Sequence, residues 1–175
     1  MRKLLLGLAI AVLAALPASA ALPVGAHAPD FVATGALAGK PFRIHLKREL
    51  ARGPVVLYFY PKAFTEGCTL EARAFSESMA EFRKASARVI GMSGDDLETL
   101  KRFSVEECRN AFPVASATPA TIAAYDVALP NRPNLSSRTS YVIDRRGRIV
   151  LVHSDPDWSQ HVAKTLAAVK ALRRR

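Results

Sequence analysis

Pro-Val-Val-Leu-Tyr-Phe-Tyr-Pro, residues 54–61, is the stretch of this chain that decides its fold. The residues from Val55 to Tyr60 are all apolar, and most of them are β-branched or aromatic. A continuous run of this kind indicates a central strand that is buried on both faces, and Pro61 ends it because proline cannot donate to a ladder of hydrogen bonds. A strand covered on both faces needs helices on both sides of its sheet, so the stretch predicts an α/β fold.

The segments after Pro61 alternate between helical and extended patterns. Phe75, Met79 and Phe82 recur near helical spacing and predict a helix over residues 66–84. The further elements that we expect are a strand over 87–92, a helix from Asp95 or Asp96 to Cys108 or Arg109, an extended stretch over 112–114, a short helix over 119–125, a hairpin of 140–143 with 149–153, and a final helix over 158–172. Together they predict a central mixed β-sheet flanked by helices.

Residues 1–20 have the three-part pattern of a secretory signal peptide. A basic head, Met1-Arg2-Lys3, precedes an apolar run from Leu4 to Leu16, and Ala18-Ser19-Ala20 forms a small-residue cleavage site. The apolar run is too short to span a bilayer comfortably, and no second hydrophobic span follows that would favour an uncleaved anchor. We therefore expect a signal peptide over 1–20, one domain over 21–175, export to the periplasm and no stable membrane insertion.

The basic composition says little about function. The chain has 25 Lys and Arg against 15 Asp and Glu, a formal net charge of +10, and its only dense cluster is Arg173-Arg174-Arg175. No aromatic residues alternate with that cluster as they do where proteins stack on bases, so we expect no nucleic-acid partner. A solvated basic surface is the favoured interpretation, and weak association with anionic lipid or wall polymer is the alternative.

Cys68 stands where open α/β sheets tend to place their functional sites. It follows the central strand after a short loop and lies in the first turn of the predicted helix. The N-terminus of a helix carries unpaired N–H groups and partial positive charge, which stabilise a thiolate, the reactive form of cysteine. Thr65 lies three residues earlier and can approach the sulfur or a bound ligand, while Pro61 can shield the pocket without offering a competing N–H.

The spacing Pro61, Thr65, Cys68 resembles the Pro-x-x-x-Thr-x-x-Cys motif of the peroxiredoxins. Three further segments are similar to that family in order and spacing. They are Gly25-Ala26-His27-Ala28-Pro29-Asp30-Phe31, Gly91-Met92-Ser93-Gly94-Asp95 and Arg138-Thr139-Ser140-Tyr141-Val142-Ile143-Asp144. Because Thr69 follows Cys68, the chain most resembles the Q-type branch, also called bacterioferritin co-migratory protein.

The resemblance implies a thioredoxin-like fold and a thiol-dependent peroxidase that reduces hydrogen peroxide and organic hydroperoxides. By this resemblance Cys68 is the nucleophile that passes through a sulfenic acid, Arg138 and Thr65 supply hydrogen bonds to the peroxide, and Glu71 orients the arginine. It further implies an external thiol reductant, either a thioredoxin-like protein or a small thiol, and a monomer. No nucleotide-binding glycine motif is present, so we expect no bound cofactor.

The second cysteine departs from the common pattern of the branch. Many Q-type members carry a resolving cysteine five residues after the first, where this chain has Arg73. Cys108 falls on the second predicted helix, where other members of the branch carry theirs. Two interpretations stay open: Cys108 forms a disulfide with Cys68 after the active-site helix unwinds, which we favour, or it is a buried core residue.

The main rival is an exported thioredoxin-fold redox protein or metallochaperone without peroxidase activity. A copper carrier of this kind needs a cysteine four residues after Cys68, where the chain has Ala72, and a C-x-x-C enzyme needs one in place of Thr65 or Glu71. Four histidines, His27, His45, His153 and His161, are scattered over separate elements without the spacing of metal ligands, so we expect no metal site.

Overall fold

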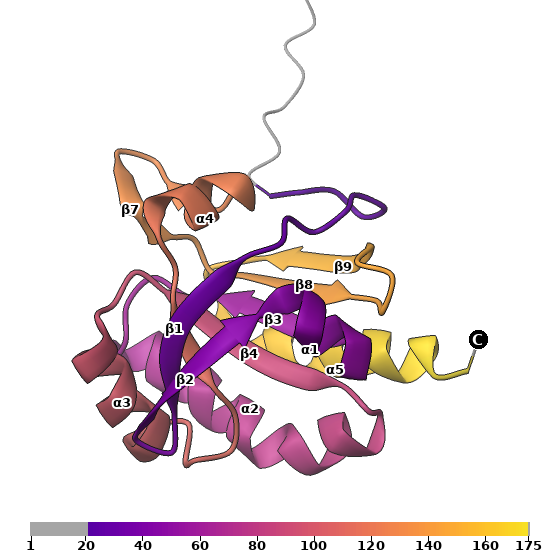
Figure 1. Cartoon of the computed structure of the whole chain (residues 1–175), viewed down its shortest axis with the longest axis horizontal. Helices are drawn as coiled ribbons and strands as arrows, with labels where there is room; N and C mark the ends of the chain where they lie inside the picture. The colour runs from indigo at the N-terminus through magenta and orange to yellow at the C-terminus, as the bar shows by residue number, and fades with distance from the viewer. Residues whose placement is uncertain (1–20, 175) are drawn as a thin grey trace, which may run out of the picture.

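The computed structural model describes residues 21–174, so the predicted signal peptide lies outside the described residues. The secondary structure in chain order is β1 (Val32–Leu37), β2 (Lys40–His45), α1 (Leu46–Arg52), β3 (Val55–Phe59), α2 (Glu66–Lys84), β4 (Arg88–Ser93), α3 (Leu97–Glu106), β5 (Val114–Ser116), α4 (Pro119–Ala124), β6 (Ala128–Leu129), β7 (Arg132–Ser136), β8 (Thr139–Ile143), β9 (Ile149–Ser154), the 3₁₀ turn η1 (Trp158–Gln160) and α5 (His161–Leu172). Figure 1 shows how these elements are arranged.

The main sheet has seven strands in the order β2-β1-β5-β4-β3-β8-β9. Strands β3, β4 and β5 run parallel to their neighbours in that group, and the remaining pairs are antiparallel, so the sheet is mixed as predicted. The strand over 55–59 is central and fully buried. Its side chains alternate between two cores: Val56 and Tyr58 lie on one face of the sheet, and Leu57 and Phe59 on the other.

Helices cover both faces of the sheet, which confirms the α/β prediction. The apolar sides of α2, α3 and α5 share one core, to which they contribute Phe75, Phe103 and Val169. The other core is closed by α1 and α4, through Leu46 and Ile122. This division explains the continuous apolar run at 54–60, because neither face of β3 meets water.

Two predicted boundaries were wrong. The second helix ends at Glu106 rather than at Cys108 or Arg109, because Arg109 and Asn110 take left-handed backbone angles (φ 50° and 60°) that end the α-helix. Cys108 therefore lies in the turn after α3, with its N–H donating to the Phe103 carbonyl oxygen at 3.0 Å. The extended stretch expected over 112–114 is β5, which begins at Val114 after Pro113.

The sequence analysis missed several elements. They are the β1–β2 hairpin, helix α1 and the β6–β7 pair. The hairpin turns at Ala38 and Gly39, both with positive φ (51° and 75°). Gly35 lies where β1 meets β5, and a side chain there would come within 2.0 Å of the Val114 carbonyl oxygen. Glycine in the middle of β1 thus permits the close strand pairing, although it weakens the strand signal in the sequence.

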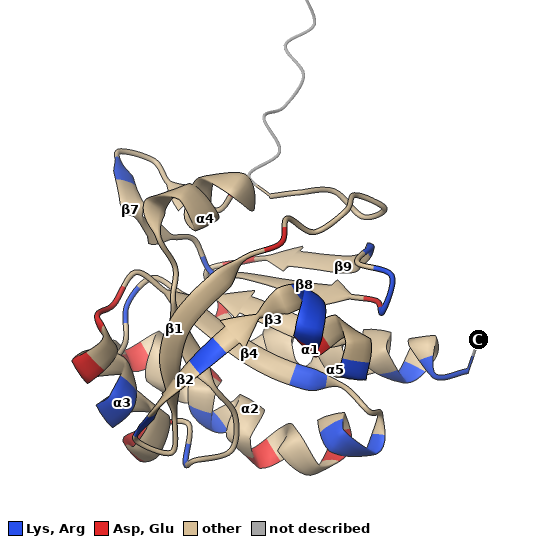
Figure 2. Cartoon of the chain, in the orientation of Figure 1, with Lys and Arg blue, Asp and Glu red and all other residues tan. Residues whose placement is uncertain are grey.

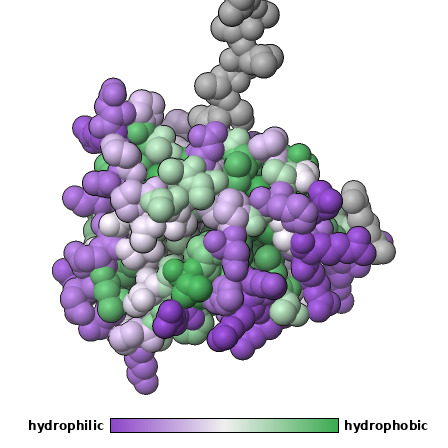
Figure 3. All heavy atoms as spheres, turned by 45° about the horizontal axis from the view of Figure 1, so that its top comes forward, coloured by the Kyte–Doolittle hydropathy of each residue, from purple (hydrophilic) through white to green (hydrophobic). Residues whose placement is uncertain are grey.

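Most charged residues lie on the outside of this fold, and the buried exceptions are Glu49, Glu71, Glu107 and Arg138. Figure 2 shows Lys and Arg around α1, at the β8–β9 turn and near the end of α5, and Figure 3 shows mostly hydrophilic residues on one face with smaller hydrophobic areas between them. The turn residues Arg145 and Arg146 are exposed. Across residues 21–174 the fold contains no helix with the length and apolar character to cross a bilayer.

We predict that Phe75→Ala destabilises the protein by about 3–5 kcal/mol, because it leaves a cavity under α2. Phe75 is fully buried and stacks on Tyr58 with ring centroids 4.4 Å apart. Urea unfolding followed by circular dichroism measures the loss. Val105→Ala, at a position on α3 that is 43% exposed, is the control with little expected effect. A loss below about 1 kcal/mol in Phe75→Ala would show that α2 is not anchored by this ring.

Candidate active site

The loop between β3 and α2 is held by the end of β4. The Asp95 carboxylate accepts a hydrogen bond from the Ala63 N–H at 2.7 Å and another from the Ser93 hydroxyl at 2.8 Å. Phe64, next in the loop, takes a left-handed backbone angle (φ 63°) and packs edge-on against Phe103. These contacts fix the path by which the chain leaves the sheet and enters α2.

Cys68 occupies the first turn of α2 and is 2% exposed. Its sulfur accepts a hydrogen bond from Nη2 of Arg138 at 3.5 Å. A guanidinium and a helix N-terminus both favour a negative charge on sulfur. The geometry therefore places this thiol in surroundings suited to a reactive thiolate.

Arg138 comes from the short link between β7 and β8 and is bound by the chain on several sides. Its Nε donates to the Pro156 carbonyl oxygen at 3.0 Å, and its Nη1 donates to the Gly67 carbonyl oxygen at 3.5 Å and to Oε2 of Glu71. A side chain at position 67 would lie only 3.0 Å from Nη2 of Arg138 and 3.8 Å from Trp158. Glycine at position 67 is therefore what lets the guanidinium reach the start of α2.

Glu71 faces Arg138 from one turn further along α2 and is fully buried. Burial raises the pKa of its carboxyl to about 8, although the adjacent Arg138 charge acts in the opposite direction. The pKa of Arg138 is raised, because the charges of Glu71 and Cys68 outweigh the effect of its own burial. Cys68, Arg138 and Glu71 thus form one buried cluster of ionisable groups.

Pro61 and Thr65 border this cluster. Pro61 and Arg138 line a cavity of about 320 Å³ together with Ser137, Asp155 and Pro156. The exposed Thr65 is the residue before α2, and its hydroxyl donates to the Lys62 carbonyl oxygen at 2.9 Å. Within the described part of the chain the Thr65 side chain makes no capping hydrogen bond to the helix, and its partner is the loop rather than the sulfur.

Cys108 lies on the same core as Cys68 but not in the cluster with Arg138. Both cysteines are buried free thiols, and burial, followed by the charge of Glu107, raises the pKa of Cys108 well above its usual value. Arg73, which stands where many Q-type members carry a resolving cysteine, donates to the Glu107 carboxylate at 2.6 Å. This ion pair links α2 to the turn that carries Cys108.

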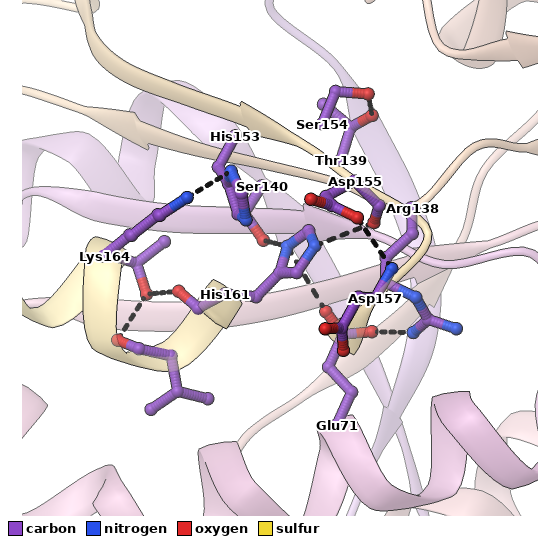
Figure 4. A network of polar contacts seen from close by, with 12 residues as sticks. Glu71, Arg138, Thr139, Ser140, His153, Ser154, Asp155, Asp157, His161 and Lys164 are labelled. Atoms are coloured by element: carbon purple, nitrogen blue, oxygen red, sulfur yellow. Dashed lines mark hydrogen bonds and ion pairs between the residues drawn. The ribbon is translucent and has the colours of Figure 1, made fainter. Parts of the chain in front are cut away.

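A further group next to the cluster was missed by the sequence analysis. His161, the first residue of α5, is fully buried, and its Nδ1 lies 3.6 Å from Oε1 of Glu71 (Figure 4). Its ring also contacts the Ser140 hydroxyl at 2.8 Å and the Asp155 carbonyl oxygen at 3.0 Å. No local pattern marks His161, because its partner Glu71 lies far away in the sequence and the two meet only through the fold.

Residues 24–152 match the family described as the AhpC/TSA family. The chloroplastic peroxiredoxin Q of Populus jackii is 36% identical over 121 residues, which cover 68% of this chain and 56% of that protein. The chain thus spans about half the length of such chloroplastic relatives. A putative peroxiredoxin of Mycobacterium tuberculosis is 34% identical over 139 residues, which cover 77% of this chain and 88% of that protein.

Solved structures agree with the sequence comparison. The crystal structure of peroxidoxin BcpB from Mycobacterium tuberculosis has a TM-score of 0.75 and 33% identity, and the match covers 85% of this chain and 97% of that one. The thioredoxin-like peroxiredoxin fold implied by the motif is thereby confirmed. The chain belongs to the AhpC/TSA family, within its peroxiredoxin Q branch.

Proposed function

We propose that the chain is a thiol-dependent peroxidase that reduces hydrogen peroxide and organic hydroperoxides with Cys68 as its nucleophile. The observation that carries this proposal is the 3.5 Å contact between Arg138 Nη2 and the Cys68 sulfur at the N-terminus of α2. Membership of the peroxiredoxin Q branch supports the same activity.

In the first step the Cys68 thiolate attacks the terminal oxygen of the peroxide. An S–O bond forms while the O–O bond breaks, the cysteine is oxidised to a sulfenic acid, and the leaving alkoxide or hydroxide takes up a proton to become alcohol or water. Arg138 stabilises the negative charge that moves from sulfur to the leaving oxygen. The Thr65 hydroxyl donates to the Lys62 carbonyl oxygen in this structure, so it has to turn away from that oxygen before it can donate to a peroxide. Pro61 shields the entrance without competing for hydrogen bonds.

The second step returns sulfur to the thiol. We propose that the Cys108 thiol attacks the sulfenic acid of Cys68, so that an S–S bond forms and water leaves. An external thiol reductant, either the dithiol of a thioredoxin-like protein or two equivalents of a small thiol, then reduces the disulfide by thiol exchange and is itself oxidised to a disulfide. Both cysteines are buried, so the first turn of α2 has to open before the sulfurs meet.

The cellular setting is also part of the proposal. If residues 1–20 act as a signal peptide, the enzyme is an exported antioxidant that works in the periplasm as a monomer. The periplasm is an oxidising compartment, which keeps exposed dithiols oxidised. The electrons that return the enzyme to its thiol form therefore have to come from an external thiol reductant.

We predict that Cys68→Ser lowers peroxide consumption by at least about a thousandfold, since the hydroxyl is far less nucleophilic than a thiolate. Consumption of hydrogen peroxide by residues 21–175 is measured with excess dithiothreitol. Cys108→Ala is the matched control that removes the other buried thiol, and its Cys68 still reacts with one equivalent of peroxide. Unchanged consumption in Cys68→Ser would overturn the peroxidase assignment.

The role of Cys108 is tested separately. After one equivalent of peroxide without reductant, peptide mapping is expected to find a Cys68–Cys108 crosslink in the wild type and a lasting sulfenic acid on Cys68 in Cys108→Ala. Arg73→Ala, which removes the link between α2 and the Cys108 turn, is expected to speed crosslink formation about threefold, as local opening becomes easier. A sulfenic acid that persists in the wild type would show that Cys108 is only a core residue.

A further inference from the structure

Five arginines from two distant segments gather on one side of the molecule. Arg145, Arg146 and Arg148 lie on the turn between β8 and β9, and Arg173 and Arg174 follow α5. All five are exposed, and Figure 2 shows the two segments on the same side of the fold. A cavity of about 490 Å³ is lined by Arg145, Arg146 and Arg173 together, so the fold joins the two segments into one surface. We call these five residues the arginine surface.

The guanidinium groups of the arginine surface are not paired with carboxylates. Within residues 21–174 none of the five forms an ion pair with Asp or Glu, whereas Arg73 and Arg109 elsewhere in the fold each bind a glutamate. Instead, Arg145, Arg148 and Arg173 each donate to a backbone carbonyl oxygen, at 3.1, 3.0 and 2.8 Å. A guanidinium has more N–H donors than these contacts use, so each group is held in place with donors left for an anion.

The nearby carboxylates reduce this positive charge only in part. Oδ1 of Asp144 accepts hydrogen bonds from the backbone N–H groups of Arg146 and Arg148, at 2.8 and 2.9 Å, and so shapes the turn. Glu81 binds the ammonium groups of Lys84 and Lys170, which border a neighbouring cavity with the arginines after α5. Five arginines beside one carboxylate in the turn leave a strongly positive surface, and phosphate is the anion that such planar donors bind best.

Apolar side chains lie among these cations. Val150 and Leu172 line both the cavity of about 490 Å³ and an adjoining one of about 420 Å³, which Val24 and Arg148 also border. Val24 is 63% exposed, so its side chain is free to make a further apolar contact. A lipid bilayer offers phosphates with an apolar layer directly beneath them, whereas nucleic acids and anionic wall polymers offer no such layer.

We propose that the arginine surface binds the headgroup layer of an anionic phospholipid bilayer. The guanidinium groups bind lipid phosphates, and Val24 enters the apolar boundary below them. The contact is peripheral and reversible, because it inserts single side chains and no helix. It does not depend on the proposed peroxidase activity.

Binding in this orientation leaves the candidate active site open to solution. Pro54 lines the cavity of the arginine surface just before β3 begins, whereas the loop that leads to Cys68 follows the other end of that strand. The strand has five residues, each of which advances the chain by about 3.3 Å. Cys68 and Arg138 therefore lie at the far end of β3 from the bilayer.

Vesicle flotation tests the proposal. The protein used is residues 21–175, which contain the whole sheet and both of its cores but lack the apolar run of residues 4–16, since that run would bind lipid by itself. At about 0.05 M salt we expect at least about tenfold more protein on phosphatidylcholine vesicles with about one-third phosphatidylglycerol than on phosphatidylcholine alone. Most of this binding is expected to be lost at about 0.5 M salt, because salt screens exposed charges. Equal binding to the two kinds of vesicle would overturn the proposal.

The double variant Arg146→Glu with Arg174→Glu locates the binding surface. Within residues 21–174 neither side chain has a hydrogen bond or an ion pair, so the fold is expected to persist, which circular dichroism checks. We expect vesicle binding to fall at least about tenfold. Lys40→Glu with Arg132→Glu is the matched control, because it makes the same change in net charge at exposed positions on β2 and β7, and it is expected to alter binding less than about twofold. Equal losses in the two double variants would show that only net charge matters and would overturn the assignment of this surface.

Two further measurements distinguish a bilayer from a soluble phosphate compound. Duplex DNA or glycerol phosphate, added at the phosphate concentration of the vesicles, is expected to leave most of the protein on the lipid, and displacement would identify a soluble anion as the preferred partner and overturn the proposal. Val24→Ser is expected to weaken vesicle binding about threefold without changing DNA binding, whereas Val105→Ser, at an exposed position on α3, changes neither. Unchanged vesicle binding in Val24→Ser would show that the surface makes no contact with the apolar layer, which would also overturn the proposal.

Discussion

The guanidinium of Arg138 binds two segments that are distant from it in the sequence, the start of α2 and the chain after β9. It donates to the Pro156 carbonyl after β9, to the Gly67 carbonyl at the start of α2 and to the Glu71 carboxyl one turn later, and its remaining nitrogen faces Cys68. A planar guanidinium has its donors in a fixed fork, so these contacts determine its orientation as well as its position. The charge beside the sulfur is therefore set by the fold and not by a flexible side chain.

The helix that carries Cys68 is also held in place by core packing and by the loop that precedes it. Phe75 holds α2 against Tyr58 on β3, and Asp95 holds the preceding loop against the end of β4. A rigid start of α2 suits attack on a small peroxide, because the donors do not have to reorganise. The same rigidity would oppose the proposed disulfide with Cys108, since both thiols are buried and the first turn of α2 would have to open. Under the proposed mechanism, resolution is therefore expected to be slower than oxidation, and the Arg73–Glu107 ion pair would influence the balance between the two steps.

The sequence predicted the centre of the molecule better than its borders. The apolar run at 54–60 and the spacing of Phe75, Met79 and Phe82 led to β3 and α2, because burial on both faces or on one helical face leaves a clear pattern. The β1–β2 hairpin was missed because a close approach to β5 requires Gly35, which removes the usual strand signal. The turn after α3 contains two residues with left-handed angles, Arg109 and Asn110, of which only the asparagine is of a type that favours them.

In the candidate site, local motifs in the sequence point to some residues, whereas a residue that joins the site only through tertiary contacts has no such motif. Pro61, Thr65, Cys68 and Glu71 lie within eleven residues of one another, and Arg138 lies in its own short motif. The ring of His161 lies 3.6 Å from the second oxygen of Glu71, and His161 has no local signature in the sequence.

The chain contains a single tryptophan, and its location next to Gly67 gives the protein an intrinsic optical probe. Trp158 begins η1, and its ring edge lies against the start of α2 beside the guanidinium. Indole fluorescence responds to nearby charge and to exposure to water. Emission from this one residue therefore monitors the first turn of α2 directly, and it distinguishes a closed, loaded site from an unwound one in real time and without any added label.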